Sequence, residues 1–379
     1  MFRLVESMIN VLHFYKVYYP DSYGGVEQVI YQLSEGCSEL GVNSTVHTLS
    51  KIRAHSVEQY ENHQVVKSKS NVEIASTPFS FTAISDFKSL AERADVIHYH
   101  FPYPYMDMLH FLCDINKPTV VTYHSDILKQ KYWLKLYKPL MMRFLDAVDV
   151  IVATSPNYVK SSEVLKSFKS KTRIIPIGIE PGNYSLSSNY SDKTIEEKLP
   201  ERFFLFIGAL RYYKGLDTLI AAVTNTQLPL VIVGSGPLED ELKQKIKAKN
   251  LNNVVMLGSV DNNDKNLLLD RCYAIVFPSH LRTEAFGITL LEGALFGKPL
   301  ISCEIGTGTT YVNIHDETGL VIPPNDHNSL ANAMEYLLEN PQKAKQYGEN
   351  SKKRFDAFFT AKQMNKSYFE IYKSLAHKF

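Results

Sequence analysis

Several features that would define a class of protein are missing from this chain of 379 residues. It has only four cysteines, and none of them form a C-x-x-C pair, so neither a disulfide framework nor a cysteine metal site is expected. No apolar run reaches the ~18 residues that span a bilayer, and no signal-peptide pattern opens the sequence. These absences favour a globular protein of a reducing compartment, which we expect to be the cytoplasm.

The chain also lacks an excess of charge of either sign. Lysine and arginine number 41, aspartate and glutamate 40, and the net charge is +1. No global field therefore attracts nucleic acid, and no nucleic-acid partner is expected. A hydrophobic content of 45% and a charged content of 21% are globular values, and the length suits two domains.

Strand-length apolar runs alternate with amphipathic stretches of helix length, which is typical of parallel sheets covered by helices. The polar, turn-rich segment 181–192 interrupts this alternation and is interpreted as a linker. The strands expected on either side of it are 10–15, 45–49, 72–75, 96–99, 119–123, 150–153, 173–177, 203–208, 230–233, 254–257, 274–277, 299–303 and 320–322.

Glu284 and Glu292, eight residues apart, are the most informative pair in the sequence. A buried-strand pattern precedes them and a helical pattern follows, so Glu284 is expected in the loop before a helix and Glu292 two turns into it. A carboxylate among apolar helix residues needs a partner, and sugar hydroxyls donate well to carboxylates. The alternative is an N-terminal charge that complements the helix dipole, followed by a solvated glutamate.

The stretch 283–299 resembles the E-x7-E signature of retaining glycosyltransferases of family GT4. Three other signatures follow the family's order: Gly24-Gly25, G-A-L-R-Y-Y-K-G at 208–215, and V-G-S-G-P at 233–237. The segments 96–104, 122–126 and 153–158 also resemble bacterial mannosyltransferases that build lipopolysaccharide O-antigen.

The resemblance implies an α/β fold of the GT-B type, with two Rossmann-like domains facing across an interdomain cleft. We expect an N-terminal, acceptor-side domain over 1–181 and a linker over 182–200. A nucleotide-sugar-binding domain is expected over 201–355, and a C-terminal helix over 356–379 should return to the N-terminal domain.

Arg211 and Lys214 follow an expected strand with a spacing that lets both reach one diphosphate. Arginine binds such a group with two donors and lysine as a point charge. Fixed cations at a leaving diphosphate lower the barrier to transfer. No D-x-D motif lies near a candidate site, so these cations are expected to take the place of a metal, and no metal or other cofactor is expected. The alternative is a pair of exposed basic residues in a loop.

The resemblance implies roles for the other candidates. Glu284 would hold hydroxyls of the transferred sugar, Glu292 the ribose, and His124 would face the donor sugar as a fourth catalytic candidate. Backbone groups at glycine turns and helix starts would contact the donor; these positions are Gly24, Gly25, Gly234, Gly236, Gly258, Val260, Phe286, Gly287 and Ile288.

Two other kinds of site receive little support. Gly234-Ser-Gly236 lacks the third glycine of a dinucleotide fingerprint, which disfavours an NAD oxidoreductase. His98 and His100 point to one face of a strand, but no third ligand is evident for a metal.

We expect a retaining hexosyltransferase, with mannose from GDP-mannose as donor and a polyprenyl-diphosphate-linked saccharide as acceptor. UDP-glucose or UDP-N-acetylglucosamine is the alternative donor. A nucleotide-sugar 2-epimerase or a non-catalytic nucleotide-sugar sensor on the same architecture are the alternative functions.

The basic, aromatic stretch 129–143, which holds the only tryptophan, Trp133, suits an interfacial helix on anionic lipid. We therefore expect peripheral binding to the cytoplasmic face of the inner membrane, with a core helix as the alternative. The first strand is expected after Met8, so residues 1–7 are interpreted as a disordered extension, or translation as starting at Met8.

Overall fold

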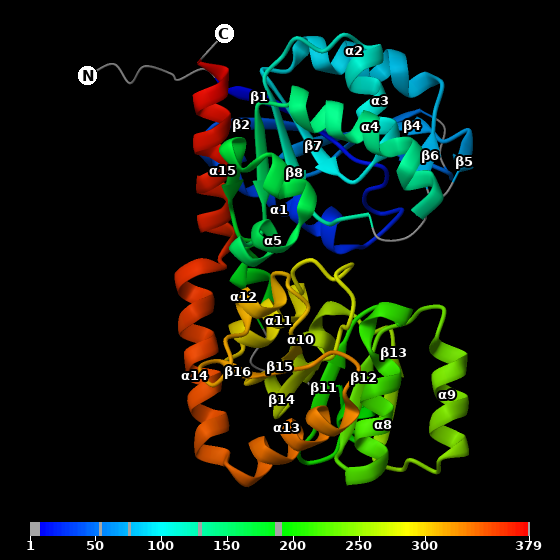
Figure 1. The fold of residues 1–379 in the computed structure, drawn as a ribbon, viewed down its shortest axis with the longest axis vertical. Helices are drawn as coiled ribbons and strands as arrows, with labels where there is room; N and C mark the ends of the chain where they lie inside the picture. Colours follow the sequence, from blue (N-terminus) through cyan, green and yellow to red (C-terminus); the bar gives the residue numbers. More distant parts are fainter. Residues whose placement is uncertain (1–7, 53–54, 75–76, 128–130, 186–191, 378–379) are drawn as a thin grey trace. The chain divides into compact units, whose positions relative to one another are not determined.

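The computed structural model describes residues 8–52, 55–74, 77–127, 131–185 and 192–377. The chain forms two compact units, each of them α/β (Figure 1). Unit 1 is Met1–Gly178 with Ala361–Phe379, and unit 2 is Ile179–Thr360. The helix near the C-terminus therefore belongs to unit 1, and the units divide after Gly178 and after Thr360. The expected extension 1–7 lies outside the described ranges, as do parts of the expected strand 72–75, basic stretch 129–143, linker 182–200 and C-terminal helix 356–379.

Unit 1 has an eight-stranded sheet in the order β10-β9-β8-β7-β1-β2-β4-β3, plus a hairpin of β5 and β6. All neighbours in the large sheet are parallel except β3 and β4. Its strands are β1 (Ile9–Phe14), β2 (Val42–Ser50), β3 (Ser56–Gln59), β4 (His63–Lys69), β5 (Val72–Ile74), β6 (Thr77–Phe79), β7 (Val96–Phe101), β8 (Thr119–Tyr123), β9 (Val150–Ala153) and β10 (Thr172–Ile174). Its helices are α1 (Gly25–Gly36), α2 (Thr82–Arg93), α3 (Pro104–Leu112), α4 (Lys131–Ala147), α5 (Pro156–Ser161), α6 (Glu163–Ser167) and α15 (Ala361–Ala376).

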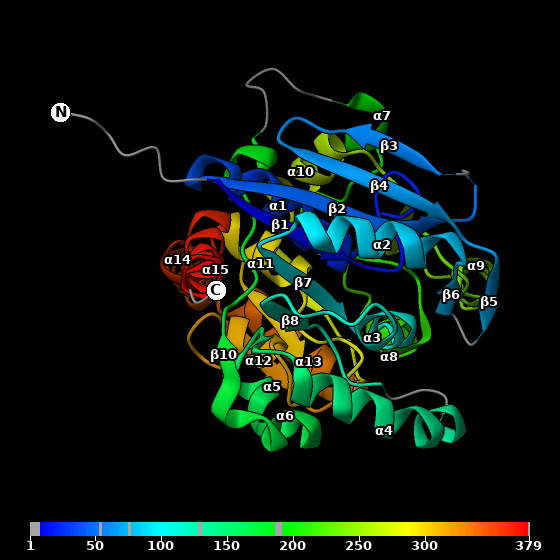
Figure 2. The ribbon, with the colours of Figure 1, turned by 90° about the horizontal axis from the view of Figure 1, so that it is seen from above.

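Helices cover both faces of this sheet, as two consecutive residues of β1 show. Successive side chains of a strand point to opposite faces. The ring of His13 meets Tyr372 of α15, whereas the ring of Phe14 meets Phe87 of α2. Figure 2 shows α2 in front of β1 and β2. The central strands are thus buried on both sides, and every residue of β7 and β8 is buried, histidines and threonines included.

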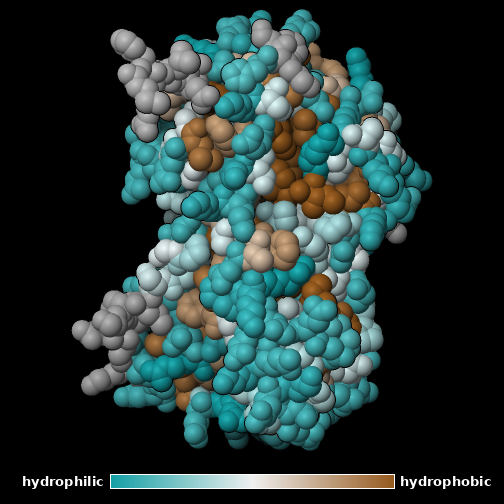
Figure 3. Space-filling model, turned by 90° about the vertical axis from the view of Figure 1, so that its left-hand side faces the viewer, coloured by the Kyte–Doolittle hydropathy of each residue, from teal (hydrophilic) through white to brown (hydrophobic). Residues whose placement is uncertain are grey.

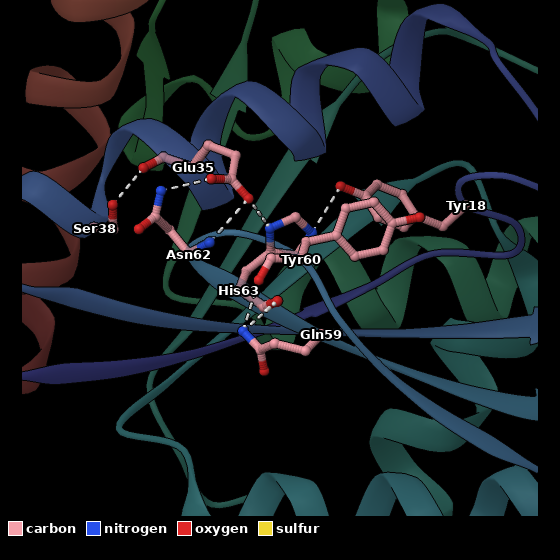
Figure 4. A network of polar contacts seen from close by, with 7 residues as sticks. All are labelled: Tyr18, Glu35, Ser38, Gln59, Tyr60, Asn62 and His63. Carbon is pink, nitrogen blue, oxygen red and sulfur yellow. Dashed lines mark hydrogen bonds and ion pairs between the residues drawn. The ribbon is translucent and has the colours of Figure 1, made fainter.

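A buried polar network joins α1 to the edge of the sheet. His63 of β4 bonds the Tyr18 hydroxyl through Nε2 at 3.1 Å and the Glu35 carboxylate through Nδ1 at 2.5 Å. Figure 4 shows the imidazole between these two side chains, with Tyr60 beside it. Because each ring nitrogen has a partner, this network is satisfied internally and acts in packing.

Unit 2 has a six-stranded, all-parallel sheet in the order β13-β12-β11-β14-β15-β16. Its strands are β11 (Phe204–Ile207), β12 (Leu230–Val233), β13 (Val254–Gly258), β14 (Ala274–Phe277), β15 (Leu300–Cys303) and β16 (Gly319–Ile322). Its helices are α7 (Lys193–Glu196), α8 (Leu216–Thr226), α9 (Glu239–Ala248), α10 (Asn262–Arg271), α11 (Ile288–Leu295), α12 (Thr309–Val312), α13 (His327–Glu339) and α14 (Pro341–Phe358).

The two faces of this sheet are again both covered. Val276 of β14 packs in a core cluster with Leu219 of α8 and Leu330 of α13. The adjacent residue, Ile275, points the other way and lies so close to Gly293 of α11 that a Cβ there would be 2.5 Å from it. Unit 2 is therefore a doubly wound, Rossmann-like unit, as the alternation of the sequence predicted.

Polar side chains cover most of the surface drawn in Figure 3, and apolar side chains show there as separate areas. Among the described helices, none has a run that is both long and apolar enough to pass through a bilayer.

Candidate functional site

The strand order of unit 2 fixes where a ligand is expected. From β11 the chain moves outward to β12 and β13, and then returns to the other side of β11 as β14. Crevices form at the carboxyl ends of strands where the order reverses in this way. The loops that follow β11 and β14 carry Arg211, Lys214 and Glu284, so three of the four catalytic candidates lie at this one position.

The structure brings Lys214 and Glu284 into direct contact. Lys214 Nζ donates to Glu284 Oε2 at 2.5 Å, and Ser279 Oγ donates to the same oxygen at 3.2 Å. Both charged side chains are only 11% and 13% exposed. The Lys214 ammonium also lies over the ring of Phe277, 4.8 Å from its centroid. The pair is thus a fixed, largely desolvated charge pair, in which electrostatic interactions are stronger than in water.

Arg211 differs from Lys214 in its exposure and in its lack of an ion-pair partner among the described residues. It precedes the short 3₁₀ turn Tyr212–Lys214 and its side chain is exposed. Within the described residues its guanidinium has no ion-pair partner. Five N–H donors in a planar fork are therefore available for an anion. Burial raises the pKa of the neighbouring Tyr213, so that phenol stays neutral beside the two cations.

Three glycine turns line the carboxyl ends of β11, β12 and β13. The N–H of Gly234 donates to the carbonyl of Gly258 at 2.8 Å, and that of Gly208 to Val233 at 3.0 Å. Gly234 has φ +129°, and a Cβ there would lie 2.1 Å from the carbonyl oxygen of Gly208. Only glycine fits this close approach. Gly236 adjoins the same turn, and half-buried Val260 follows Gly258 in the next loop.

The start of α11 holds the remaining backbone candidates. Ile288 is its first residue, Gly287 is its N-cap, and Phe286 lies in the loop before it. Gly287 has φ +91° and packs against Phe277, the strand residue beneath Lys214. The first N–H groups of a helix have no partner within it and suit an anion or a hydroxyl.

Glu292 is buried in α11 and already has partners. Its Oε1 accepts from Tyr184 Oη at 3.0 Å and from Lys265 Nζ at 2.9 Å. Sequence reasoning anticipated that this carboxylate needs a partner but missed Lys265 and Tyr184, because their distances along the chain give no signal. A carboxylate has about four lone-pair positions, so a ligand hydroxyl can still share it.

In unit 1, Gly24 and Gly25 lie at the N-terminus of α1, as expected. Glu27, in the first turn of that helix, is buried, and its carboxylate would be 2.5 Å from a Cβ on Gly24. The carboxylate complements the helix dipole, and a side chain at Gly24 would force it to move. A phosphate at these glycines would have to approach beside a negative charge.

His124 follows β8 and is one of a group of buried histidines in unit 1. Burial lowers its pKa to about 3, so the ring is neutral at physiological pH. The third histidine that the sequence did not reveal beside His98 and His100 is His13 of β1; ring nitrogens of these three lie within 4.8 Å of one another. Both nitrogens of His98 bond hydroxyls at 2.7 Å, on Tyr372 and Thr122.

A cavity of about 310 Å³ opens in unit 1 where β1, β2 and β4 end. Lys16, Asp21, Lys51 and Glu73 are among its lining residues. Asp21 Oδ1 accepts from the fully buried Lys67 at 3.1 Å, whereas buried Asp21 Oδ2 has no partner among the described residues. Such an oxygen is costly to bury alone, and the ion pair with Lys67 offsets part of that cost.

Comparison with known proteins agrees with this geometry. Residues 23–183 match the family model described as Glycosyltransferase Family 4, and residues 189–354 match that of Glycosyl transferases group 1. The chain is 51% identical to O-antigen chain mannosyltransferase C of Escherichia coli, over 97% of this chain and 99% of that protein. It is also 51% identical to D-rhamnosyltransferase WbpZ of Pseudomonas aeruginosa, over 93% of each.

The fold has solved relatives at lower identity. Sucrose-phosphate synthase from Thermosynechococcus elongatus superposes with a TM-score of 0.80 at 21% identity, over 98% of this chain and all of that one. The two matched family models, together with half-identical relatives of full length, confirm the resemblance: the chain belongs to glycosyltransferase family 4, with the GT-B fold, and is a glycosyltransferase.

Proposed function

We propose that this glycosyltransferase moves mannose from GDP-mannose, with retention of configuration, onto a polyprenyl-diphosphate-linked saccharide in the synthesis of O-antigen or a related surface polysaccharide. The full-length similarity to an O-antigen chain mannosyltransferase carries the proposal. The charge pair of Lys214 with Glu284, beside the unpaired Arg211, is the arrangement that such a donor requires.

The chemistry follows from these residues. The bond between the sugar C1 and the diphosphate oxygen breaks as the acceptor hydroxyl oxygen bonds C1 from the same face. The acceptor proton passes to an oxygen of the leaving diphosphate. Lys214 has three N–H donors; one holds Glu284 and two remain for phosphate oxygens. Arg211 supplies a second cation, and fixed cations stabilise the charge that develops there.

On the acceptor side, the cavity bounded by Lys16, Asp21 and Lys51 is the proposed place for a sugar of the lipid-linked saccharide. Lys16 and Lys51 can donate to sugar hydroxyls there, and Asp21, held by Lys67, adds a carboxylate to the lining. Asp21→Asn should raise KM for the acceptor and leave KM for the donor unchanged. An equal rise in both would contradict this placement.

A second donor has a specific observation in its favour. The equally similar Pseudomonas aeruginosa relative is a D-rhamnosyltransferase, and D-rhamnose is mannose without its 6-hydroxyl. The rival donor is therefore GDP-D-rhamnose, which would bind through the same nucleotide contacts. The UDP sugars remain a further alternative.

Transfer assays with purified full-length protein would separate these possibilities. GDP-mannose, GDP-D-rhamnose, UDP-glucose and UDP-N-acetylglucosamine would each be offered with a synthetic polyprenyl-diphosphate-linked saccharide, with Arg211→Ala as the control enzyme. The product's anomeric configuration, read by NMR, would test retention. Transfer from GDP-mannose alone would support the proposal, and transfer from another donor only would replace it. Donor turnover without acceptor would favour an epimerase.

We propose that an enzyme with a polyprenyl-linked acceptor binds the surface of the inner membrane, and we assign the contact to α4. Lys135, Leu136 and Lys138 of this helix are exposed, whereas Phe144 is buried. Basic and apolar side chains on one outer surface suit anionic lipid. Flotation with phosphatidylglycerol vesicles should weaken in Lys135→Glu/Lys138→Glu, and Lys243→Glu on α9 is the control. Equal flotation of both would refute the assignment.

A further inference from the structure

Three histidine rings form a hydrogen-bonded chain across neighbouring strands of unit 1. His13 Nδ1 lies 3.2 Å from His100 Nε2, and His100 Nδ1 lies 3.1 Å from His124 Nε2. These residues come from β1, from β7 and from the residue after β8, which are adjacent in the sheet. All three side chains are buried, and burial lowers the pKa of each ring far below 6.5.

A neutral imidazole has one N–H and one lone pair. The single N–H of His100 can serve only one of its two neighbours, so both hydrogen bonds must run in the same direction. In the first direction every ring carries its proton on Nε2, and His13 ends the chain with a free N–H. In the second every ring carries its proton on Nδ1, and His13 ends it with a free lone pair.

The environment of His13 favours the second direction. Its Nε2 is buried and has no hydrogen-bond partner among the described residues. Among buried backbone groups an orphaned N–H is rarer than an orphaned acceptor, and by analogy we place the lone pair rather than the N–H on this unpartnered nitrogen. At the opposite end of the row of histidines, His124 then carries its proton on Nδ1.

We propose that His13 and His100 are positioning residues, which hold the His124 ring through Nε2 and make its Nδ1 a hydrogen-bond donor to a sugar hydroxyl. The contact of His124 with the sugar rests on the proposed function. The hydrogen bonds among the three histidines do not. His124 in this state donates and cannot accept a proton at Nδ1, so it orients the substrate and is not the base.

A metal ion within the same group would require a different arrangement. It would have to replace one of the two hydrogen bonds of His100, to His13 or to His124, and His98 would have to give up the hydroxyl of Tyr372 or Thr122. The hydrogen-bonded chain uses these atoms as they stand.

The wild-type protein alone tests the chain. In histidine labelled with ¹⁵N, long-range ¹H–¹⁵N correlation spectra distinguish the two tautomers, and His→Asn or His→Leu variants assign the signals. We expect the Nδ1–H tautomer at His13, His100 and His124 at pH 7. An Nε2–H tautomer at His124 would overturn the proposal. So would the loss of these N–H signals on adding Zn²⁺, which would indicate a metal site. Neither result depends on the sugar transferred.

Variants at the far end of the chain test its effect on His124. Asn at position 13 keeps a donor near the place of Nδ1, whereas Leu removes it. His13→Leu should populate the Nε2–H tautomer of His124 and lower kcat roughly 10-fold with little change in donor KM, because a misoriented group near the reaction costs one or two orders of magnitude. His13→Asn should restore both.

His47 is the matched control. It is a fully buried histidine of the neighbouring strand β2, bonded to Ser68 at 2.8 Å and outside the chain. His47→Leu should leave the His124 tautomer and kcat unchanged. If His47→Leu and His13→Leu lower kcat equally and neither shifts the tautomer, the role of His13 is only packing.

Discussion

The ammonium of Lys214 lies 2.5 Å from the carboxylate of Glu284, although 70 residues separate them. The contact exists because β11 and β14 are hydrogen-bonded neighbours at the point where the sheet order reverses. One group able to hold phosphate and one able to hold sugar hydroxyls are thereby fixed at a single edge. Each also neutralises the other while no substrate is bound, which limits the cost of burying either charge.

Removing either cation at this edge should slow transfer. Arg211→Ala and Lys214→Ala should each lower kcat by about 10²-fold, as the loss of one fixed charge stabiliser does elsewhere. Lys214→Ala should also destabilise unit 2, because Glu284 would keep its charge without a cation, whereas exposed Arg211 should not. Steady-state kinetics and thermal unfolding measure the two effects.

Lys245→Ala is the control for this pair. Lys245 is an exposed lysine of α9 that contacts Asp217 and Glu241, and surface pairs contribute about 1 kcal/mol or less. Lys245→Ala should therefore have the unfolding temperature and the kcat of the wild-type protein. Normal kcat in Lys214→Ala would show that Lys214 serves the fold and not the donor.

Glu292 should affect nucleotide affinity. Glu292→Gln keeps the shape but removes the charge that holds Lys265, and a hydrogen bond to a charged group is worth about 1.5–3 kcal/mol. We therefore expect GDP to bind roughly 10-fold more weakly or worse, as measured by calorimetry. Tyr184→Phe removes one of its two contacts and leaves the carboxylate, so it should bind GDP nearly as wild type. Similar losses in both variants would assign Glu292 to packing alone.

The glycine turns give a prediction on stability. Gly234→Ala would drive a Cβ against the backbone of the adjacent strand end and should cost about 3 kcal/mol or more. Gly258 is the matched position: it has φ +71°, but nothing lies within 4 Å of a Cβ there. Gly258→Ala should cost only about 1–2 kcal/mol for the left-handed backbone. Equal urea midpoints for the two variants would contradict the steric argument.

Acid should destabilise this protein well above the pH at which carboxylates titrate. Burial lowers the folded pKa of His13 and His124 to about 3 and of His47 and His110 to about 4. Unfolded histidine titrates near 6.5. Above that pH neither state binds the proton; as pH falls below it, only the unfolded state does. Each such histidine then removes about 1.4 kcal/mol of stability per pH unit.

Urea unfolding between pH 7.5 and 5 measures this slope. The buried carboxyl of Asp107 opposes the trend, because burial raises its pKa and its contribution falls as pH rises. Asp107 is one group and the buried histidines are several, so the free energy of unfolding should still rise with pH. His47→Asn should reduce the slope by about one histidine's share. A flat profile would mean that these rings are hydrated in the folded state.

Much of the fold was accessible from the sequence because its strands are short apolar runs between helical patterns. The misses have physical causes. Strand β4 (His63–Lys69) is polar by composition, yet Lys67 is fully buried between Asp21 and Glu58, so hydropathy alone does not reveal it. The break between α5 and α6 is at Ser162, whose extended backbone caps α6, and no glycine or proline marks it in the sequence.

The candidate site, too, was predictable from the sequence only in part. Motif spacing singled out Lys214, Glu284 and Glu292, which lie after a strand or within a helix with a recognisable pattern, and their roles stay predictions. Contacts between segments far apart in the sequence could not be predicted. Examples are the contact of Lys265 with Glu292 and that of the His13 ring with His100. Pairing of that kind depends on sheet order, which a single sequence leaves open.

The division of the chain into units bears on how the protein is made. Unit 1 is built from two stretches separated by the whole of unit 2, and Tyr368 and Tyr372 of α15 bury their rings against the histidines of its sheet. Translation delivers segments in order, so unit 2 can be complete while unit 1 still lacks this helix. During that interval the sheet would present an uncovered apolar and polar surface, the kind of transient exposure that promotes aggregation and chaperone binding. A strain with limited chaperone capacity should therefore accumulate nascent chains with an unprotected unit 1 before it loses finished enzyme.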